Sequence, residues 1–266
     1  MFAAVFSQIR PGAAYVPWEV EPADLPAKLA ALRELSAGGF NVTIPYKETL
    51  IPYLDAVEGD AAALGAVNCV VARGARFVGL NTDAVALEAS LAEALRQARL
   101  PGFCPTALVL GAGGAAKAAV LALERFGARA ITVAARRSEA VFDNPFFADR
   151  TSRIPFEPAV VEAAADLSDI VVNATPVGMF PDMAHSPLSG GFHRHQVVYD
   201  LIYNPRPTLF LRQAADAGAM TLDGLDMLAR QAAASLRIWT GANVSHQKFL
   251  AAARAEEVRA ASSRRR

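Results

Sequence analysis

The feature that most constrains the fold is a glycine-rich turn between an apolar run and an alanine-rich segment. Residues 106–110 read Thr-Ala-Leu-Val-Leu, which is typical of a short strand buried on both faces. Gly111, Gly113 and Ala116 follow in the spacing Gly-x-Gly-x-x-Ala. The alanine- and leucine-rich residues 115–126 then favour a helix that ends at a glycine. A strand, a glycine turn and a helix in this order predict a dinucleotide-binding unit.

Each small residue of this turn has its own physical reason. Gly111 permits the tight turn, Gly113 lets the backbone approach a pyrophosphate, and Ala116 allows close packing of helix against strand. The helix N-terminus then offers free N–H groups and a positive partial charge to the phosphates. A glycine turn chosen only for its geometry is the alternative, and the strand–turn–helix context argues against it.

The same alternation of strand and helix continues along the chain. Residues 207–217 predict a helix. Four more apolar runs predict strands, at residues 130–134, 170–173, 197–200 and 219–222. Strands separated by helices are typical of a parallel sheet built from βαβ units, so this part of the chain is predicted to be Rossmann-like.

The residues before the glycine turn predict a second, smaller α/β unit. Its expected elements are a strand at 14–20, a helix capped by Asp24 and running to Leu35, a strand at 40–43, and a hairpin of 65–71 and 76–80 around Arg73-Gly74. After Gly224 helical patterns return at residues 227–240 and 246–261. We expect these helices to pack back on the first unit, which gives a two-domain α/β protein with a discontinuous first domain.

Composition excludes several classes of protein. The 266-residue chain has 26 Lys plus Arg and 26 Asp plus Glu, so its formal net charge of zero argues against a globally basic nucleic-acid binder. Hydrophobic residues make up 53%, enough for a large core. Cys69 and Cys104 are too few for a disulfide framework, and the sequence contains neither a signal-peptide pattern nor an apolar run long enough to span a membrane. We expect a cytoplasmic protein that binds neither nucleic acid nor membranes.

The end of the second Rossmann strand favours NADP over NAD. NAD-binding turns are usually followed, about 20 residues on, by an acidic residue that binds the ribose. Here Arg136 and Arg137 stand in that region, and no acid precedes Glu139. Guanidinium groups suit a 2′-phosphate because they form charge-assisted hydrogen bonds with it. A solvated surface pair of arginines is the alternative.

A polar substrate site is predicted in the first unit. Residues 40–48 read as an apolar strand that ends in polar side chains, turns at Pro45 and places Lys47 in the first turn of a helix. A lysine is unfavourable there for the helix dipole, which makes it a better functional candidate than an average surface lysine. Asp83 supplies a carboxylate at the other boundary of the same unit. We expect Lys47 and Asp83 to face one another across a polar substrate if the two domains form a cleft.

At these residues the sequence resembles the shikimate dehydrogenase family, over nearly the whole chain and in the family's order. The blocks that carry the resemblance are 41–47 (Asn-Val-Thr-Ile-Pro-Tyr-Lys), 65–68 (Gly-Ala-Val-Asn), 79–83 (Gly-Leu-Asn-Thr-Asp), 111–115 (Gly-Ala-Gly-Gly-Ala), 173–179 (Asn-Ala-Thr-Pro-Val-Gly-Met), 200–205 with Thr208, 224–228 with Gln231, and 239–241.

The resemblance implies a role for each matching residue. It implies a catalytic pair, Lys47 and Asp83. It implies substrate contacts from Thr43, Asn68, Asp83, Tyr203 and Gln231. It implies NADP contacts from Gly111, Ala112, Gly113, Gly114, Ala115, Arg136, Thr175, Val177, Met179, Gly224 and Met227. Arg137 joins this predicted cofactor site on its charge alone. Plainer roles stay open for some of them: a helix N-cap for Asp83, a turn residue for Asn68, and packing for Tyr203 and Gln231.

The implied domains are a substrate-binding domain of residues 1–83, with 224–266 returning to it, and an NADP-binding domain of residues 84–223. The implied reaction is the reversible, NADP-dependent reduction of 3-dehydroshikimate to shikimate in aromatic biosynthesis. A paralogue that prefers quinate or an aminated analogue, and a catalytically weak NADP-binding module, are the alternatives. The expected partner is a small-molecule substrate, the expected assembly a monomer or homodimer, and no metal site is expected.

Two departures from the family pattern matter. Relatives carry an early strand and a Ser-x-Ser-Pro segment whose hydroxyls bind the substrate carboxylate, and this sequence has neither. A misassigned start, a truncation and a real loss are the three explanations, and an unpaired sheet edge with marginal stability or self-association is the expected consequence. Ala135-Arg136-Arg137 stands where the family commonly has Asn-Arg-Thr, so we expect rearranged contacts to the adenosine.

Overall fold

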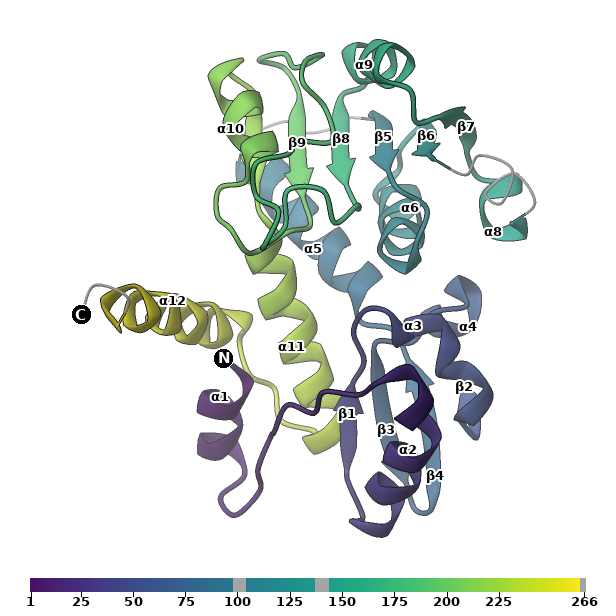
Figure 1. The fold of residues 1–266 in the computed structure, drawn as a ribbon, viewed down its shortest axis with the longest axis vertical. Coiled ribbons are helices and arrows are strands. Elements are labelled where there is room, and N and C mark those ends of the chain that lie inside the picture. Colours follow the sequence, from purple (N-terminus) through teal and green to yellow (C-terminus); the bar gives the residue numbers. More distant parts are fainter. Residues whose placement is uncertain (98–103, 137–143, 264–266) are drawn as a thin grey trace. The chain divides into compact units, whose positions relative to one another are not determined.

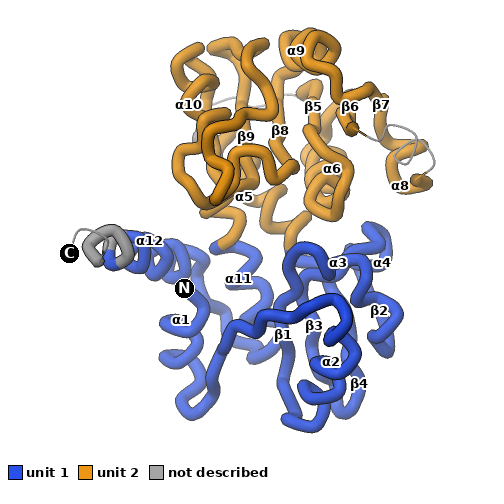
Figure 2. The backbone as a smooth tube through the Cα atoms, viewed as in Figure 1, with its two compact units in different colours: residues 1–82, 229–266 blue, residues 83–228 orange. Residues whose placement is uncertain are grey.

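The computed structural model describes residues 1–97, 104–136 and 144–263, which form two compact units (Figures 1 and 2). Unit 1 contains residues 1–82 and 229–266, and unit 2 contains residues 83–228. That one predicted domain binds the substrate and the other binds the cofactor stays a prediction.

Unit 2 is built on a six-stranded parallel sheet. Its strands lie in the order β10-β9-β8-β5-β6-β7. Their bounds are β5 Thr106–Leu110, β6 Ala130–Ala135, β7 Ser152–Pro155, β8 Ile170–Asn173, β9 Val197–Asp200 and β10 Met220–Leu222. The chain runs outward from β5 in one direction to β7 and then returns to the other side of β5. This arrangement confirms the predicted Rossmann-like parallel sheet, and its doubly wound strand order places the topological switch point between β5 and β8.

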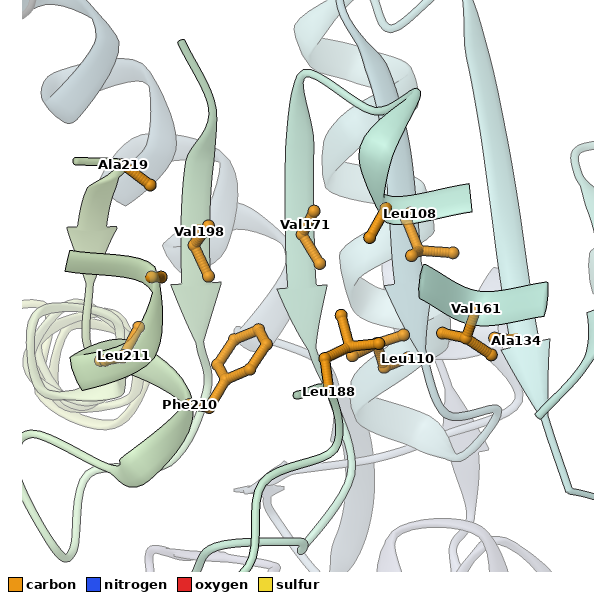
Figure 3. Packing of buried hydrophobic residues seen from close by; sticks show 12 residues of the cluster. Leu108, Leu110, Ala134, Val161, Val171, Leu188, Val198, Phe210, Leu211 and Ala219 are labelled. Atoms are coloured by element: carbon orange, nitrogen blue, oxygen red, sulfur yellow. The ribbon is translucent and has the colours of Figure 1, made fainter. Parts of the chain in front are cut away.

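Helices cover both faces of this sheet. They are α5 Asp83–Gln97, α6 Gly114–Phe126, α8 Pro145–Ala148, α9 Pro158–Asp166 and α10 Leu209–Asp216. On one face α9 and α10 supply Val161 and Phe210, which pack on Leu108, Val171 and Val198 of three adjacent strands (Figure 3). On the other face lie α5 and α6, which pack against one another. The strands are Val-, Ile- and Leu-rich because they are buried on both sides.

Unit 1 is built on a four-stranded mixed sheet in the order β1-β3-β4-β2. The bounds are β1 Gly39–Asn41, β2 Ala56–Val57, β3 Cys69–Arg73 and β4 Arg76–Leu80. β3 and β4 form the predicted hairpin, with Gly74 at a positive φ of 64° in the turn. Because β1 and β4 both run antiparallel to β3, the end of β1, the start of β3 and the end of β4 lie at one edge of this sheet.

Short helices and the two chain ends complete unit 1. The elements are α1 Phe2–Ile9, η1 Pro22–Asp24, α2 Leu25–Glu34, α3 Tyr46–Thr49, η2 Ile51–Tyr53, α4 Asp60–Leu64, α11 Gly224–Thr240 and α12 His246–Ser263. The first residues of α11 belong to unit 2 and the rest to unit 1. Leu25 and Leu29 of α2 pack on Val70 and Phe77 of the sheet. The C-terminal residues 229–266 belong to unit 1: α1 packs on α12, and Phe2 packs edge-on against Phe249.

The close approach of α11 to the sheet explains why residue 39 is a glycine. Trp239 Nε1 donates a hydrogen bond to Val70 O at 2.9 Å. A Cβ atom at Gly39 would lie 2.3 Å from Trp239 Nε1 and 2.5 Å from Val70 O. A side chain at position 39 would therefore displace the indole ring.

The prediction of a strand at 14–20 is wrong. Residues 13–21, all within the described part of the chain, form neither helix nor strand. Pro17 cannot donate a ladder hydrogen bond, which disfavours pairing. The segment is instead fixed by side chains: the Tyr15 ring stacks on Phe2 with centroids 4.4 Å apart, and Tyr15 Oη donates to Asn41 Oδ1 at 3.1 Å.

Two smaller predictions also need correction. The helix expected from Asp24 begins at Leu25, and within the described residues the Asp24 side chain makes no capping hydrogen bond. The hairpin strand expected from residue 65 begins at Cys69, because Gly65 adopts a left-handed conformation that ends α4. Among the described helices, none is at once long and apolar enough to cross a lipid bilayer.

Candidate active site

The predicted phosphate turn lies at the switch point of the unit 2 sheet. Gly111 follows β5 with φ of 106°, a conformation that favours glycine. A Cβ at Gly111 would lie 3.1 Å from Ala174 O and 3.2 Å from Thr175 Cγ2, whereas a Cβ at Gly113 would meet no atom within 4 Å. The turn therefore packs tightly on the segment after β8 at Gly111 and is open at Gly113.

The helix that follows has the properties that a phosphate group requires. α6 is 13 residues long and begins directly after Gly113, and among the described residues no side chain caps it there. Its first N–H groups and its dipole favour an anion. Ala116 is fully buried, as close packing of this helix on the sheet demands. The residues present thus fit a dinucleotide, with the pyrophosphate at the N-terminus of α6.

The segment after β8 is shaped by one buried amide. Asn173 Oδ1 accepts hydrogen bonds from Thr175 N at 3.0 Å and from Thr175 Oγ1 at 2.7 Å. Thr175 Oγ1 in turn accepts from Val177 N at 3.2 Å. Gly178, with φ of 94°, follows, and a Cβ there would lie 3.0 Å from His185 O. We call residues 173–178 the β8 turn.

A buried carboxylate lies beside this amide. Asp200 ends β9, is fully buried, and accepts from Asn173 Nδ2 at 3.0 Å, from Ile202 N at 3.1 Å and from Thr208 Oγ1 at 2.6 Å. Burial raises the pKa of Asp200 from 3.8 to about 6, although these hydrogen bonds act in the opposite direction. No role was predicted for Asp200, although an acidic residue that closes the apolar run Val-Val-Tyr-Asp is a signal that points to it.

The other predicted cofactor residues lie at the carboxyl side of the same sheet or on α11. Arg136 is exposed and directly follows β6, whereas Arg137 and the residues up to 143 lie outside the described residues. Met179 is 38% exposed and Met227 is buried on α11. Gly224 begins α11, and a Cβ there would lie 2.2 Å from Leu201 O, so this position accepts only glycine.

The predicted substrate residues of unit 1 gather at one edge of its sheet. Val42 N donates to Asn68 O at 2.9 Å, and Val67 N donates to Lys47 O at 2.7 Å. These two bonds place the segment of Thr43 and Lys47 beside Asn68. Thr43 is exposed and Lys47 is half-buried in α3. An exposed hydroxyl and a partly shielded ammonium suit contacts to a polar small molecule.

Asn68 and Gln231 lie beside Thr82 at this edge. Asn68 is buried and accepts from Thr82 N at 2.8 Å, while its Nδ2 donates to Thr82 Oγ1 at 3.0 Å. Thr82 Oγ1 is 3.5 Å from the backbone oxygen of Gln231. Asn68 thus also serves as a residue that shapes the turn before Asp83.

Asn41 is a second organising residue whose role was not predicted. Its Oδ1 accepts from Tyr15 Oη, and its Nδ2 donates to Asn68 O at 3.1 Å and to Ser235 Oγ at 3.0 Å. Burial is the largest cause that raises the pKa of Tyr15, so its hydroxyl stays a donor. No short-range pattern identifies this role, because Ser235 is 194 residues away in the sequence.

Two further predicted residues belong to unit 2. Asp83 is buried and is the first residue of α5, and Tyr203 is 49% exposed in the segment after β9. The prediction that Lys47 and Asp83 face one another stays a prediction. Within residues 1–97, 104–136 and 144–263, no three His, Cys, Asp or Glu side chains are grouped in a way that would hold a metal ion.

Comparisons with known protein families match both ends of the chain. Residues 1–70 match the shikimate dehydrogenase substrate binding domain. Residues 224–254 match the shikimate 5'-dehydrogenase C-terminal domain. Both matches fall largely within unit 1.

Curated and solved relatives extend the similarity to most of the chain. The shikimate dehydrogenase (NADP(+)) of Moorella thermoacetica is 39% identical over 253 residues, which are 91% of this chain and 82% of that protein. The shikimate 5-dehydrogenase of Thermus thermophilus, solved in complex with NADP(H) and shikimate, is 34% identical with a TM-score of 0.79, covering 95% of this chain and 91% of that one. A quinate dehydrogenase from Corynebacterium glutamicum, in complex with NAD, is 28% identical with a TM-score of 0.78, covering 94% of this chain and 92% of that one. The chain belongs to the shikimate dehydrogenase family.

Proposed function

We propose that the protein is an NADP-dependent shikimate dehydrogenase, which interconverts 3-dehydroshikimate and shikimate. The observation that carries this proposal is the 39% identity over 91% of the chain to an NADP-dependent relative of that name, with every residue of the predicted site present in the described chain except Arg137. A location in the cytoplasm and a monomeric or homodimeric state belong to the same proposal.

The cofactor would be bound by unit 2. The N–H groups at the start of α6, opened by Gly113 and Gly114, would bind the pyrophosphate. Arg136 would pair with the 2′-phosphate, which distinguishes NADP from NAD. The β8 turn and Met227 would border the nicotinamide. When bound, NADP(H) supplies or accepts the hydride.

The protein's own side chains would supply and accept the proton of this reaction. Lys47 would donate a proton or a hydrogen bond to the substrate's carbonyl oxygen during reduction, and would be the base-side partner during oxidation. Asp83 would orient the ammonium group and accept a hydrogen bond from a substrate hydroxyl. A catalytic lysine–carboxylate pair separates this proposal from a module that only binds NADP, which needs neither group.

The remaining contacts suit a hydroxylated ring that carries a carboxylate. Thr43, Asn68 and Gln231 offer hydrogen bonds without net charge, which match ring hydroxyls. Tyr203 would donate a hydrogen bond from its phenol hydroxyl to the substrate carboxylate, and the exposure of this residue leaves the hydroxyl accessible.

The test is a spectrophotometric assay at 340 nm with shikimate and NADP+ in one direction and 3-dehydroshikimate and NADPH in the other. The purified protein is expected to turn over both pairs, with a lower KM for NADP+ than for NAD. Lys47→Ala is expected to lower kcat by at least about 100-fold while the circular dichroism spectrum stays unchanged. Near-normal turnover of Lys47→Ala would remove the lysine from the catalytic role, and an inactive wild-type protein that still binds NADP+ would favour the binding module.

A second candidate is a quinate dehydrogenase, favoured by the similarity to the Corynebacterium glutamicum structure. Quinate differs from shikimate by a saturated ring and an added hydroxyl. A ratio of kcat/KM that favours quinate over shikimate would select this candidate.

A further inference from the structure

A buried carboxylate in unit 2 has no part in the proposed chemistry, yet it is bonded to the segment that would border the nicotinamide. Asp200 ends β9 and Asn173 ends the neighbouring parallel strand β8, and the two residues are paired in register. Both are fully buried. We call Asn173, Thr175, Asp200 and Thr208 the Asp200 network.

The carboxylate fixes which way the amide of Asn173 points. A carboxylate only accepts hydrogen bonds, so the amide presents Nδ2 to Asp200, at 3.0 Å from Oδ1. The opposite end of the same amide, Oδ1, is then directed at the two donors of Thr175, its backbone N–H and its hydroxyl. If the amide were reversed, its NH₂ group would meet the backbone N–H of Thr175, and both groups would be donors.

The amide orientation in turn sets the shape of the β8 turn. Thr175 Oγ1 donates to Asn173 Oδ1 and accepts from Val177 N at 3.2 Å, and Asn173 Nδ2 lies 3.4 Å from Val177 O. Three backbone groups of the turn, one on Thr175 and two on Val177, therefore depend on one side chain, either directly or through one hydroxyl. That side chain is oriented by Asp200.

The turn so formed is the wall of the predicted phosphate site. Ala174 O and Thr175 Cγ2 would lie 3.1 Å and 3.2 Å from a Cβ at Gly111. A dinucleotide at the switch point binds in the crevice outside the carboxyl ends of β5 and β8, where these two segments lie. A shift of the β8 turn therefore changes the space left for the cofactor.

The second carboxylate oxygen of Asp200 is bonded to the residue that caps helix α10. Asp200 Oδ2 accepts from Thr208 Oγ1 at 2.6 Å, and Thr208 Oγ1 also caps α10 by accepting from Leu211 N. Thr208 makes no contribution to the β8 turn through any bond described above. It therefore offers a control that disturbs the same carboxylate without touching the amide.

We propose that Asp200 is a positioning residue for the nicotinamide cofactor: by orienting the Asn173 amide it holds the β8 turn in the conformation that binds NADP(H). This inference rests on the proposed function only for the identity of the cofactor. The effect on the turn itself is a property of the protein without any ligand.

Two variants separate positioning from ordinary stability. Asp200→Leu keeps a side chain branched at the same carbon but has no acceptor for the Asn173 amide, so the dissociation constant for NADP+ is expected to rise about tenfold, while the KM for shikimate stays within about twofold. Thr208→Val removes the hydroxyl from the other carboxylate oxygen and from the cap of α10. It is expected to lower the unfolding midpoint and leave the NADP+ dissociation constant within about twofold.

The measurements are calorimetric titration with NADP+, steady-state kinetics with shikimate, and hydrogen exchange of the peptide that covers residues 173–180. Faster exchange of this peptide in Asp200→Leu, but not in Thr208→Val, is expected and requires no cofactor. Unchanged exchange and unchanged NADP+ affinity in Asp200→Leu would overturn the inference. So would an equal loss of affinity in both variants, since that pattern indicates a purely structural role.

A third variant covers the case in which Asp200→Leu does not fold. Thr175→Val breaks the same chain of bonds at a half-buried residue outside the sheet, whereas Thr175→Ser keeps the hydroxyl. Weaker NADP+ binding and faster exchange in Thr175→Val with recovery in Thr175→Ser support the inference, and equal behaviour of the two overturns it. A wild-type protein that does not bind NADP+ would refute the proposed function, and the exchange comparison would still decide whether Asp200 controls the turn.

Discussion

Each unit of the molecule has an asparagine at the end of a strand that organises the surrounding segments, but the two asparagines have different partners. Asn173 in unit 2 binds a carboxylate, Asp200, and a threonine only two residues away. Asn41 in unit 1 binds neutral groups, on Tyr15, Asn68 and Ser235. We call these four residues of unit 1 the Asn41 network.

The difference has a physical consequence. The neutral Asn41 network keeps its hydrogen bonds at any pH near neutrality, because its only titratable member is a phenol whose pKa burial raises further. The Asp200 network contains a buried acid whose pKa is about 6. In unit 1 the segments around Asn41 are therefore held by hydrogen bonds between neutral groups. In unit 2 the Asp200 carboxylate is costly to bury, but it specifies one orientation of the Asn173 amide.

The largest expected effect concerns the packing that supports the Asn41 network. Gly39→Ala would place a methyl group 2.3 Å from Trp239 Nε1 and 2.5 Å from Val70 O, so it must displace α11 and break the Trp239 bond. We expect a loss of about 3–5 kcal/mol in the free energy of unfolding, measured by urea denaturation. Gly38→Ala is the matched control, because a Cβ at Gly38 would meet no atom within 4 Å. Equal stability of the two variants would contradict this account of unit 1.

The second effect tests the contrast in charge directly. A folded-state pKa of about 6, above the ordinary 3.8, means that the folded protein binds the proton of Asp200 more tightly than the unfolded chain does. The contribution of this group to stability is therefore greatest below pH 4 and is lost as the pH rises through 6. From pH 5 to pH 8 the loss amounts to about 1–2 kcal/mol.

Asp200→Asn removes this dependence, so the difference in unfolding free energy between variant and wild type should change by that amount between the two pH values. Asn41→Ser, in the neutral network, should be destabilised equally at both. Parallel pH profiles of Asp200→Asn and wild type would show that the carboxyl group of Asp200 does not titrate in this range.

The sequence predicts unit 2 better than unit 1, and the two networks show why. Unit 2 consists of apolar strands and helices whose signals are local, down to Gly111 after β5 and Gly127 at the end of α6, which has φ of 93°. The hydrogen bond between Asn173 and Thr175 is likewise local. Only the register that brings Asp200 beside Asn173 needs the folded sheet.

Unit 1 depends on contacts between distant parts of the chain. Residues 14–20 have strand-like composition, yet their conformation is fixed by the Tyr15 ring and hydroxyl, whose partners no local pattern reveals. Helix α11 is evident from periodicity, but its contact with Asn41 spans 194 residues. The positions of Lys47 and Asp83 in the sequence predicted a pair that faces a polar substrate, whereas their role as a catalytic pair was implied only by the family resemblance.

The smallest expected effect compares one serine from each unit. Ser235 on α11 and Ser90 on α5 are both buried, and each accepts a hydrogen bond from a residue of the adjacent sheet: Ser235 from Asn41 at 3.0 Å and Ser90 from Tyr199 Oη at 2.8 Å. Ser235→Ala leaves one N–H of the half-buried Asn41 amide unpaired, with an expected cost of about 1–2 kcal/mol.

Ser90→Ala leaves a phenol that can rotate its hydroxyl hydrogen, so the expected cost is lower, about 1 kcal/mol.

The functional readouts should also differ, because Asn41 also donates to the backbone oxygen of Asn68, a proposed substrate residue. Ser235→Ala is expected to raise the KM for shikimate by about two- to threefold, since one of the two N–H groups of Asn41 Nδ2 loses its acceptor. Ser90→Ala should leave that KM unchanged. Equal KM values for the two variants would mean that the Asn41 network stabilises unit 1 without positioning Asn68, and its likeness to the Asp200 network would then be limited to hydrogen-bond geometry.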